Sequence, residues 1–237
     1  MGRGTARVLR HIYYFSQSEV IMSSFKFRLD SYMPMLMHAD DIEAADELIA
    51  WRKDPKNKNF SKAGDDRTPA WTWQTYLYRD EENAIAMPSQ NLMVAIRQGA
   101  ARIILKGNKT FKELSQSGLF IAAENLKFTV NGEQISLKSI DKMKEKNISF
   151  DKQADAVRDL GFRLFLKRAR IGTAKHIRVR PRFDKWEVSG EIQVLVPEIT
   201  DEIREQLFEY AGNIGLCDWR PGCKTPGPYG MFTTTWL

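Results

Sequence analysis

The segment 176–196 constrains the fold more than any other part of this 237-residue chain. Its first part, HIRVRPRF, alternates apolar with basic residues, and its second part, WEVSGEIQVLV, alternates apolar with polar residues. An apolar side chain at every second position is typical of a β-strand that buries one face. Only Asp184 and Lys185 separate the two parts, so we expect them to form a β-hairpin.

Other strand and helix patterns lie on both sides of this hairpin. They are a strand over 25–37, a helix over 87–106, strands over 127–130 and 135–137 joined by an Asn131-Gly132 turn, a helix over 201–215 capped by Thr200, and a last strand over 229–237. With insertions at about 40–86 and 141–174 set aside, the order is strand, helix, strand, strand, helix, strand. This order predicts an α+β fold with an antiparallel sheet and a ferredoxin-like βαββαβ core, the skeleton of RNA-recognition motifs.

The composition agrees with a single domain over residues 22–237. Hydrophobic residues make up 43% of the chain, which is enough to build a core. Residues 1–21 show no periodicity and carry Arg3, Arg7 and Arg10, so we interpret them as a flexible basic extension or a product of upstream start assignment. No run of about 18 apolar residues and no signal-peptide pattern occurs, so we expect a cytoplasmic protein without a membrane partner.

The first insertion carries three distinct patterns. Residues 42–51 have helical spacing, with one apolar face made of Ile42, Ala45, Leu48 and Ile49. A long loop over 52–70 follows, and long loops are usually functional or disordered. The next stretch is a dense aromatic patch made of Trp71, Trp73, Tyr76 and Tyr78. These rings either stack on nucleic-acid bases or fill a small satellite core.

Basic residues are concentrated between positions 161 and 185. In a strand, HIRVRPRF places Arg178, Arg180 and Arg182 on one face together with His176. Guanidiniums about 7 Å apart along a strand approximate the repeat of a nucleic-acid backbone, and each can bind a phosphate through two oxygens. The same patch is extended by Arg163, Lys167, Arg168, Arg170 and Lys175. The alternative is a solvated strand face whose arginines pair with Glu187 and Glu191.

Patterns for metal-dependent or nucleophilic catalysis are weak. Cys217 and Cys223 are too few for a structural zinc site, and the three histidines are scattered. Acidic clusters near positions 40–43, 65–66 and 80–82 could hold Mg²⁺, but such runs are more often wet helix starts or loops. No triad, P-loop or HExxH motif occurs. We therefore expect no cofactor, no metal and no catalysis, with His38 as the alternative general base.

The stretch 215–232, GLCDWRPGCKTPGPYGMF, follows the last predicted helix. Glycines allow backbone N–H groups to approach phosphate oxygens, and prolines keep a loop stiff and open. Arg220 and Lys224 add positive charge beside the basic strand. We interpret the stretch as a ligand-binding loop; the alternative is that glycine and proline only turn the chain.

Two motifs resemble the RAMP superfamily, the RNA-recognition-fold subunits of CRISPR effector complexes. The segment MPSQNLMVAIRQGA at 87–100 is similar to that superfamily's I-P-G-S-S-L-K-G-A-L-R helix start, and 215–232 is similar to its glycine-rich loop. Short phage-encoded proteins with a similar ending also look related. The resemblance implies nucleic-acid contacts at Ser89, Asn91, Arg97, Gly215, Arg220, Gly222, Lys224, Gly227 and Gly230, to which we add Trp219.

Together these patterns predict a non-catalytic protein that binds single-stranded nucleic acid, RNA more than DNA. The resemblance implies oligomers along the strand or assembly with other effector or phage subunits. It also implies one alternative, a metal-independent RNA-processing endonuclease that uses His38 as general base. A further alternative is a phage protein that uses the fold for protein contacts through Trp73 or Trp219.

Overall fold

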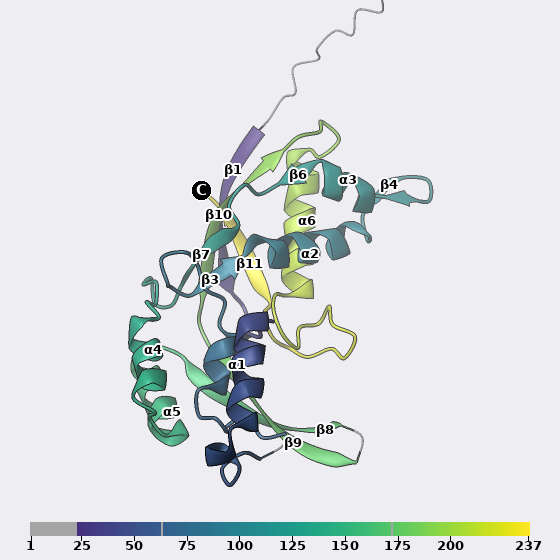
Figure 1. Cartoon of the computed structure of the whole chain (residues 1–237). Helices are drawn as coiled ribbons and strands as arrows, with labels where there is room; N and C mark the ends of the chain where they lie inside the picture. Colours follow the sequence, from purple (N-terminus) through teal and green to yellow (C-terminus); the bar gives the residue numbers. More distant parts are fainter. Residues whose placement is uncertain (1–22, 63, 172) are drawn as a thin grey trace, which may run out of the picture.

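The protein is a mixed α/β structure built around antiparallel sheets. The computed structural model describes residues 23–62, 64–171 and 173–237, so the predicted extension over 1–21 lies outside the described residues. Within this range the main sheet contains β11 (Phe232–Trp236), β1 (Ser23–Ser31), β10 (Glu187–Val194), β7 (Asn125–Thr129) and β3 (Ala86–Pro88) in that order, with β6 (Leu119–Phe120) also paired to β10 (Figure 1). Neighbouring strands in this sheet are all antiparallel.

Two helices, α2 (Ser89–Ala100) and α6 (Asp201–Ile214), pack together against the main sheet (Figure 1). Both were predicted from apolar residues at helical spacing, and both bury that face. Thr200 caps α6 as expected, since its side chain accepts a hydrogen bond from the N–H of Ile203. Gly99 lies where the helices cross, and a Cβ there would come within 2.8 Å of the Tyr210 side chain.

The second sheet contains β2 (Met35–Leu36), β9 (Ala174–Phe183) and β8 (Arg163–Ile171) in that order. The predicted hairpin between 176–183 and 186–196 is therefore wrong, because β9 pairs with β8 while β10 pairs with β1 and β7. Both edges of β10 are occupied, which leaves no edge for β9. Asp184 and Lys185 also lack the positive φ angles that a two-residue hairpin turn requires.

The Asn131-Gly132 turn forms, but the hairpin predicted around it does not. Both turn residues have positive φ, 54° and 84°, and Val130 pairs with Glu133 across them. The pairing goes no further along residues 135–137, because β7 is already flanked by β3 and β10. Tertiary pairing on both edges thus limits the hairpin to its turn.

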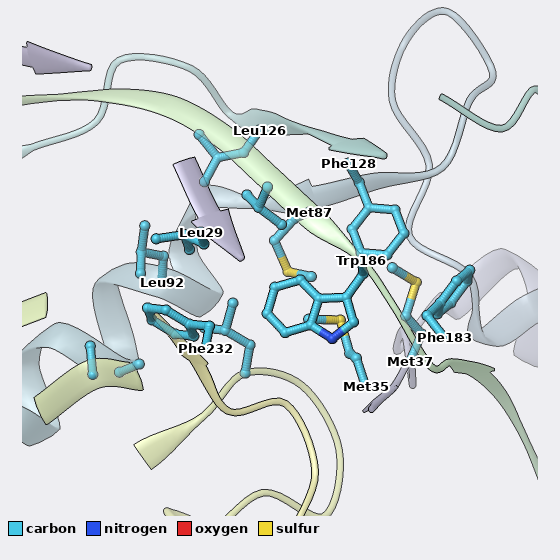
Figure 2. Packing of buried hydrophobic residues seen from close by; sticks show 14 of the residues in the cluster. Leu29, Met35, Met37, Met87, Leu92, Leu126, Phe128, Phe183, Trp186 and Phe232 are labelled. Atoms are coloured by element: carbon cyan, nitrogen blue, oxygen red, sulfur yellow. The ribbon is translucent and has the colours of Figure 1, made fainter. Parts of the chain in front are cut away.

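Figure 2 shows the core where the two sheets meet, with Trp186 beside Met35, Met87 and Phe128. The Trp186 indole donates a hydrogen bond to the Met33 carbonyl, so its one polar atom is satisfied. Trp71 and Trp73 are also buried, at 7% and 0% exposure. The aromatic patch therefore contributes to the core, and Trp73 cannot anchor a protein interface.

The first insertion forms α1 (Ile42–Lys53), the 3₁₀ turns η1 (Pro55–Asn57) and η2 (Thr72–Tyr76), and intervening loops. The predicted helix forms, but its apolar face is not buried. No residue of α1 is buried, and Ile42 and Ile49 are 78% and 47% exposed. The periodicity is present in the sequence, but the fold brings no apolar partner onto that face.

The remaining elements are β4 (Ile104–Lys106), β5 (Lys109–Thr110), α3 (Lys112–Ser117), α4 (Lys138–Glu145) and α5 (Phe150–Asp159). The second predicted insertion, 141–174, thus contains the last part of α4, all of α5 and the whole of β8. In the described ranges 23–62, 64–171 and 173–237, no helix has the length and apolar character needed to cross a bilayer.

Candidate nucleic-acid interface

The β8–β9 register divides the predicted basic patch between two faces. Each residue lies on the same side as its partner, so Lys167 lies beside Arg178 and Arg163 beside Arg182. His176, Phe165 and Arg180 lie on this same face, which we call the basic face. Three other predicted patch residues, Arg168, Arg170 and Lys175, lie at alternate positions and therefore on the opposite face. A single patch containing all of them is ruled out by the alternation of the strand.

The arginines of β9 are paired with carboxylates. Arg178 Nη1 lies 2.8 Å from Asp66 Oδ1, and Arg182 Nε lies 2.7 Å from Asp184 Oδ1. Arg180 contacts both Asp66 and Asp218, at 3.4 and 2.9 Å. The expected row of three unpaired guanidiniums is therefore wrong. The alternative partners Glu187 and Glu191 are also wrong, because they lie on β10 in the other sheet.

Asp66 is the residue of this candidate site that sequence reasoning missed. It is 1% exposed, and it accepts hydrogen bonds from the Val179 N–H as well as from Arg178 and Arg180. The loop that carries it lies along β9, where the N–H of Ile177 donates to the Gly64 carbonyl. The signal in the sequence is the Asp65-Asp66 pair within an otherwise polar loop, for which the pattern favoured a solvated loop over a Mg²⁺ site.

The C-terminal loop over 215–231, which we call the terminal loop, packs across the basic face. Trp219 and Tyr229 have ring centroids 5.4 Å apart, and Phe165 of β8 lies 5.9 Å from Tyr229. The Lys167 ammonium lies over the Trp219 ring, and the Arg182 guanidinium lies 5.7 Å from the Tyr229 centroid. Cations and aromatic rings therefore alternate where the loop meets the hairpin, an arrangement typical of single-strand binding surfaces.

The loop glycines serve a different purpose from the one predicted. Their N–H groups all donate to carbonyls of this chain: Gly215 to Ala211, Gly222 to Ile214, Gly227 to Arg220 and Gly230 to Pro34. Added Cβ atoms would meet Tyr229, Ile214, Trp219 and Leu216, respectively. In this conformation the glycines allow close packing and offer no N–H donors to a phosphate. The loop is therefore closely packed, and its glycine N–H groups are used within the chain.

A cavity of about 400 Å³ opens between the basic face and the terminal loop, and we call it the basic groove. Its walls include Phe165, Lys167, Arg178, Trp219 and Lys224. Positive charge exceeds negative charge around it. Among the described residues that line it, the four cations Lys167, Arg178, Arg180 and Lys224 face one carboxylate, Asp218.

A second cavity of about 200 Å³ adjoins the first through Asp218 and contains His38, Tyr78, Asn91 and Arg220. His38 Nδ1 lies 3.8 Å from Asp218 Oδ2, and its ring packs edge-on against Tyr76. The side chain is still 43% exposed, yet partial burial lowers its pKa, and the nearby Arg180 charge lowers it further. The imidazole is thus favoured in its neutral form.

Burial also changes the acidity of two neighbours in this cavity. It raises the pKa of the Tyr78 phenol to about 12, with a smaller contribution from Cys217. It raises the pKa of the Cys217 thiol as well, and the Cys217 sulfur lies 3.6 and 3.7 Å from the sulfurs of Met35 and Met87. Both groups therefore stay protonated near neutral pH.

Of the predicted contact residues on α2, namely Ser89, Asn91 and Arg97, only Asn91 lines one of these cavities. Asn91 lines the second cavity, whereas the Ser89 N–H donates to the Glu124 carbonyl at the start of α2. Arg97 lies in the last turn of α2, and its Nε is buried without a hydrogen-bond partner among the described residues. His176 packs its ring against Gly64 rather than into the basic groove.

The fold and this site define a mixed α/β protein with a cationic, aromatic groove between a β-hairpin and a C-terminal loop. The sequence matches no protein-family model, and no curated protein shows significant similarity to it.

Proposed function

We propose that this protein binds single-stranded nucleic acid, RNA more than DNA, in the basic groove without catalysing its cleavage. The observation that carries the proposal is the contact between cations and rings, in which Lys167 lies over Trp219 and Arg182 lies near Tyr229 and Phe165. Single strands are bound by positive charge along the backbone and by stacking of bases on aromatic rings. Lys167, Trp219 and Phe165 line this one cavity, and Arg182 and Tyr229 lie beside Phe165.

The pairing of Arg178, Arg180 and Arg182 weakens a proposal based on charge alone, but a cationic surplus remains. Asp66 neutralises only part of the charge of two arginines, and Lys167 and Lys224 line the groove with no carboxylate partner among the described residues. A polyanion therefore gains from entering the groove, whereas a neutral ligand does not. Trp219 and Phe165 then favour unpaired bases over a duplex, whose bases are already stacked.

The arrangement of the main sheet supports a ferredoxin-like core of the RAMP type. In chain order, β1, α2, β7, β10, α6 and β11 form βαββαβ, and β10 lies between β1 and β7. The terminal loop joins α6 to β11, the place that the glycine-rich loop has in that superfamily. By the same resemblance, we propose that several copies, or other effector or phage subunits, assemble along one strand.

Binding is tested with nuclease-treated protein and labelled oligomers of about 20 nucleotides. Fluorescence anisotropy would be recorded with single-stranded RNA, single-stranded DNA and duplex RNA across a salt series. We expect the highest affinity for single-stranded RNA, a lower one for single-stranded DNA and the lowest for duplex RNA. Each affinity should fall steeply as the salt concentration rises, because binding of phosphates releases counterions. Absence of binding, or an affinity independent of salt, would overturn the proposal. Native mass spectrometry with longer RNA reports whether copies add along the strand.

The second cavity supports one other candidate, a metal-independent endonuclease. His38 is held largely neutral and can accept a proton, while Arg220 in the same cavity could stabilise a charged phosphorane-like intermediate. Labelled RNA would be incubated in EDTA with the wild-type protein and with His38→Ala. Cleavage that persists in EDTA and disappears in the variant supports the enzyme. RNA that stays intact with both proteins removes this candidate.

A further inference from the structure

The basic groove has the composition of a pocket for one small planar group. Its volume of about 400 Å³ falls within the range of small-molecule sites. The walls are mostly apolar, with Leu36, Phe165, Ala169 and Trp219, and a few polar groups converge on the same space. Such a pocket suits an aromatic heterocycle with a polar edge, the chemical character of a nucleobase.

Trp219 is held as a stacking surface. One side of its indole is covered by Tyr229, with an interplanar angle of 30°, and Gly227 packs closely against the ring edge. The Lys167 ammonium lies over the Trp219 ring, and both residues line the groove. A base can therefore take the place of the Lys167 ammonium on the ring. The Lys167 side chain is long enough to move its ammonium to the phosphate of the bound nucleotide.

Asp218 places a hydrogen-bond acceptor on the wall of the same pocket. Its Oδ2 accepts from Arg180 Nε at 2.9 Å, and its backbone N–H donates to the Leu36 carbonyl, which holds the side chain in place. Its Oδ1 accepts no hydrogen bond from the described part of the chain. A carboxylate oxygen attracts an amino group and repels a carbonyl oxygen.

We propose that the basic groove selects a base with an exocyclic amino group, stacked on Trp219 and donating to Asp218, so that cytosine binds more tightly than uracil. The inference rests on the proposed single-strand binding and names its base preference. Cytosine carries an amino group at position 4, where uracil carries a carbonyl oxygen, and its ring N3 is an acceptor where that of uracil is an N–H donor. Arg178 keeps further N–H donors beyond the one on Asp66, and these can reach the acceptor edge of cytosine.

The test compares oligocytidine with oligouridine, each of about 12 nucleotides, by anisotropy at one salt concentration and neutral pH. We expect the wild-type protein to favour oligocytidine by about tenfold. Asp218→Asn presents an amide that can donate to the uracil carbonyl, so its preference falls to about one or inverts. Asp184→Asn is the matched control, since Asp184 pairs with Arg163 and Arg182 outside the groove, and it keeps the wild-type ratio.

A second measurement needs no variant. Oligomers of the pyrimidin-2-one ribonucleoside lack only the amino group of cytosine, and we expect the wild-type protein to bind them about as weakly as oligouridine. Equal affinity for all three oligomers overturns the base preference and leaves single-strand binding intact. Absence of binding to any oligomer overturns the proposed function itself. The two failures are therefore distinct.

Discussion

The Asp66 carboxylate joins the guanidiniums of Arg178 and Arg180, at 2.8 and 3.4 Å, from a loop more than 100 residues away in sequence. Asp66 is 1% exposed, so the charges around it are shielded from water on the carboxylate side. The two cationic partners offset the cost of burying this carboxylate. This contact attaches the first insertion to β9 and sets how much positive charge the basic face offers a ligand.

Asp66→Asn should destabilise the protein by about 3 kcal/mol or more, because it leaves two part-buried guanidiniums without their shared counterion. Urea denaturation at pH 7 measures the free energy of unfolding. Asp184→Asn makes the same chemical change at a half-exposed carboxylate and should cost less than about 1 kcal/mol. Equal losses in the two variants would show that the Asp66 contacts contribute little.

Trp219→Ala should weaken single-stranded RNA binding by about 1–3 kcal/mol, the contribution of one base stacked on an aromatic ring. Lys167→Ala should instead lower the slope of log affinity against log salt by about one, because one phosphate contact is lost. Lys109→Ala, in the exposed β5 strand far from the groove in sequence, serves as the matched lysine control. Anisotropy titrations at several salt concentrations separate the two effects. If Lys109→Ala weakens binding as much as Lys167→Ala, the groove is not where the strand binds.

His38 should make the stability of the protein fall as the pH is lowered below about 6.5. Its pKa is lowered in the folded state, so the unfolded chain binds a proton at a higher pH than the native one does. Its contribution is thus fully present above the unfolded pKa and is lost as the pH falls through the folded value. Thermal melts from pH 7.5 to 5 should show a shallower pH dependence for His38→Gln than for wild type. Superimposable profiles would contradict a lowered pKa.

Gly230→Ala should destabilise the protein much more than Gly132→Ala. Both glycines have positive φ, 74° and 84°, so both substitutions carry the same backbone cost of about 1 kcal/mol. Only at Gly230 would the new Cβ also collide with the Leu216 backbone, whereas Gly132 has open space around it. The collision should add about 1–3 kcal/mol in urea denaturation. Similar losses would mean that the terminal loop shifts to accept the methyl group.

Cys217 should react with a thiol reagent far more slowly than Cys223. Burial raises the pKa of the Cys217 thiol, and the thiolate is the reactive form. A reaction with excess Ellman's reagent at pH 8 should show one fast and one slow thiol. The Cys223→Ser variant should lose the fast phase and Cys217→Ser the slow one. Two thiols reacting at the same rate would show that the terminal loop opens readily.

Local patterns predicted the elements whose burial follows directly from their own periodicity. Helices α2 and α6, the Thr200 cap and the alternation within β9 are all present as expected. The hairpin of 176–183 with 186–196 was wrong, since period-two alternation identifies a strand but says nothing about its partner. The same limit applies to α1, whose apolar face has correct spacing and no neighbour to cover it.

The candidate site was predictable as residue types but not as an arrangement. The concentration of arginine and lysine in 161–185 and the glycine- and proline-rich terminal loop were evident in the sequence, and the structure places the loop and only part of that basic segment around one groove. The counterions were not predictable, because Asp66, Asp184 and Asp218 reach the arginines from three separate segments.

The sequence by itself determined helices α2 and α6, the Thr200 cap at which α6 begins, the alternation in β9, and that positive charge gathers on β8 and β9. Only the tertiary structure decided which strands pair, which face each cation occupies, and which carboxylates neutralise the arginines. The physical reason is the sequence separation over which each kind of interaction acts. Helical periodicity, capping and alternation act over a few neighbouring residues, whereas strand pairing and buried charge compensation depend on groups that meet only after the chain has folded.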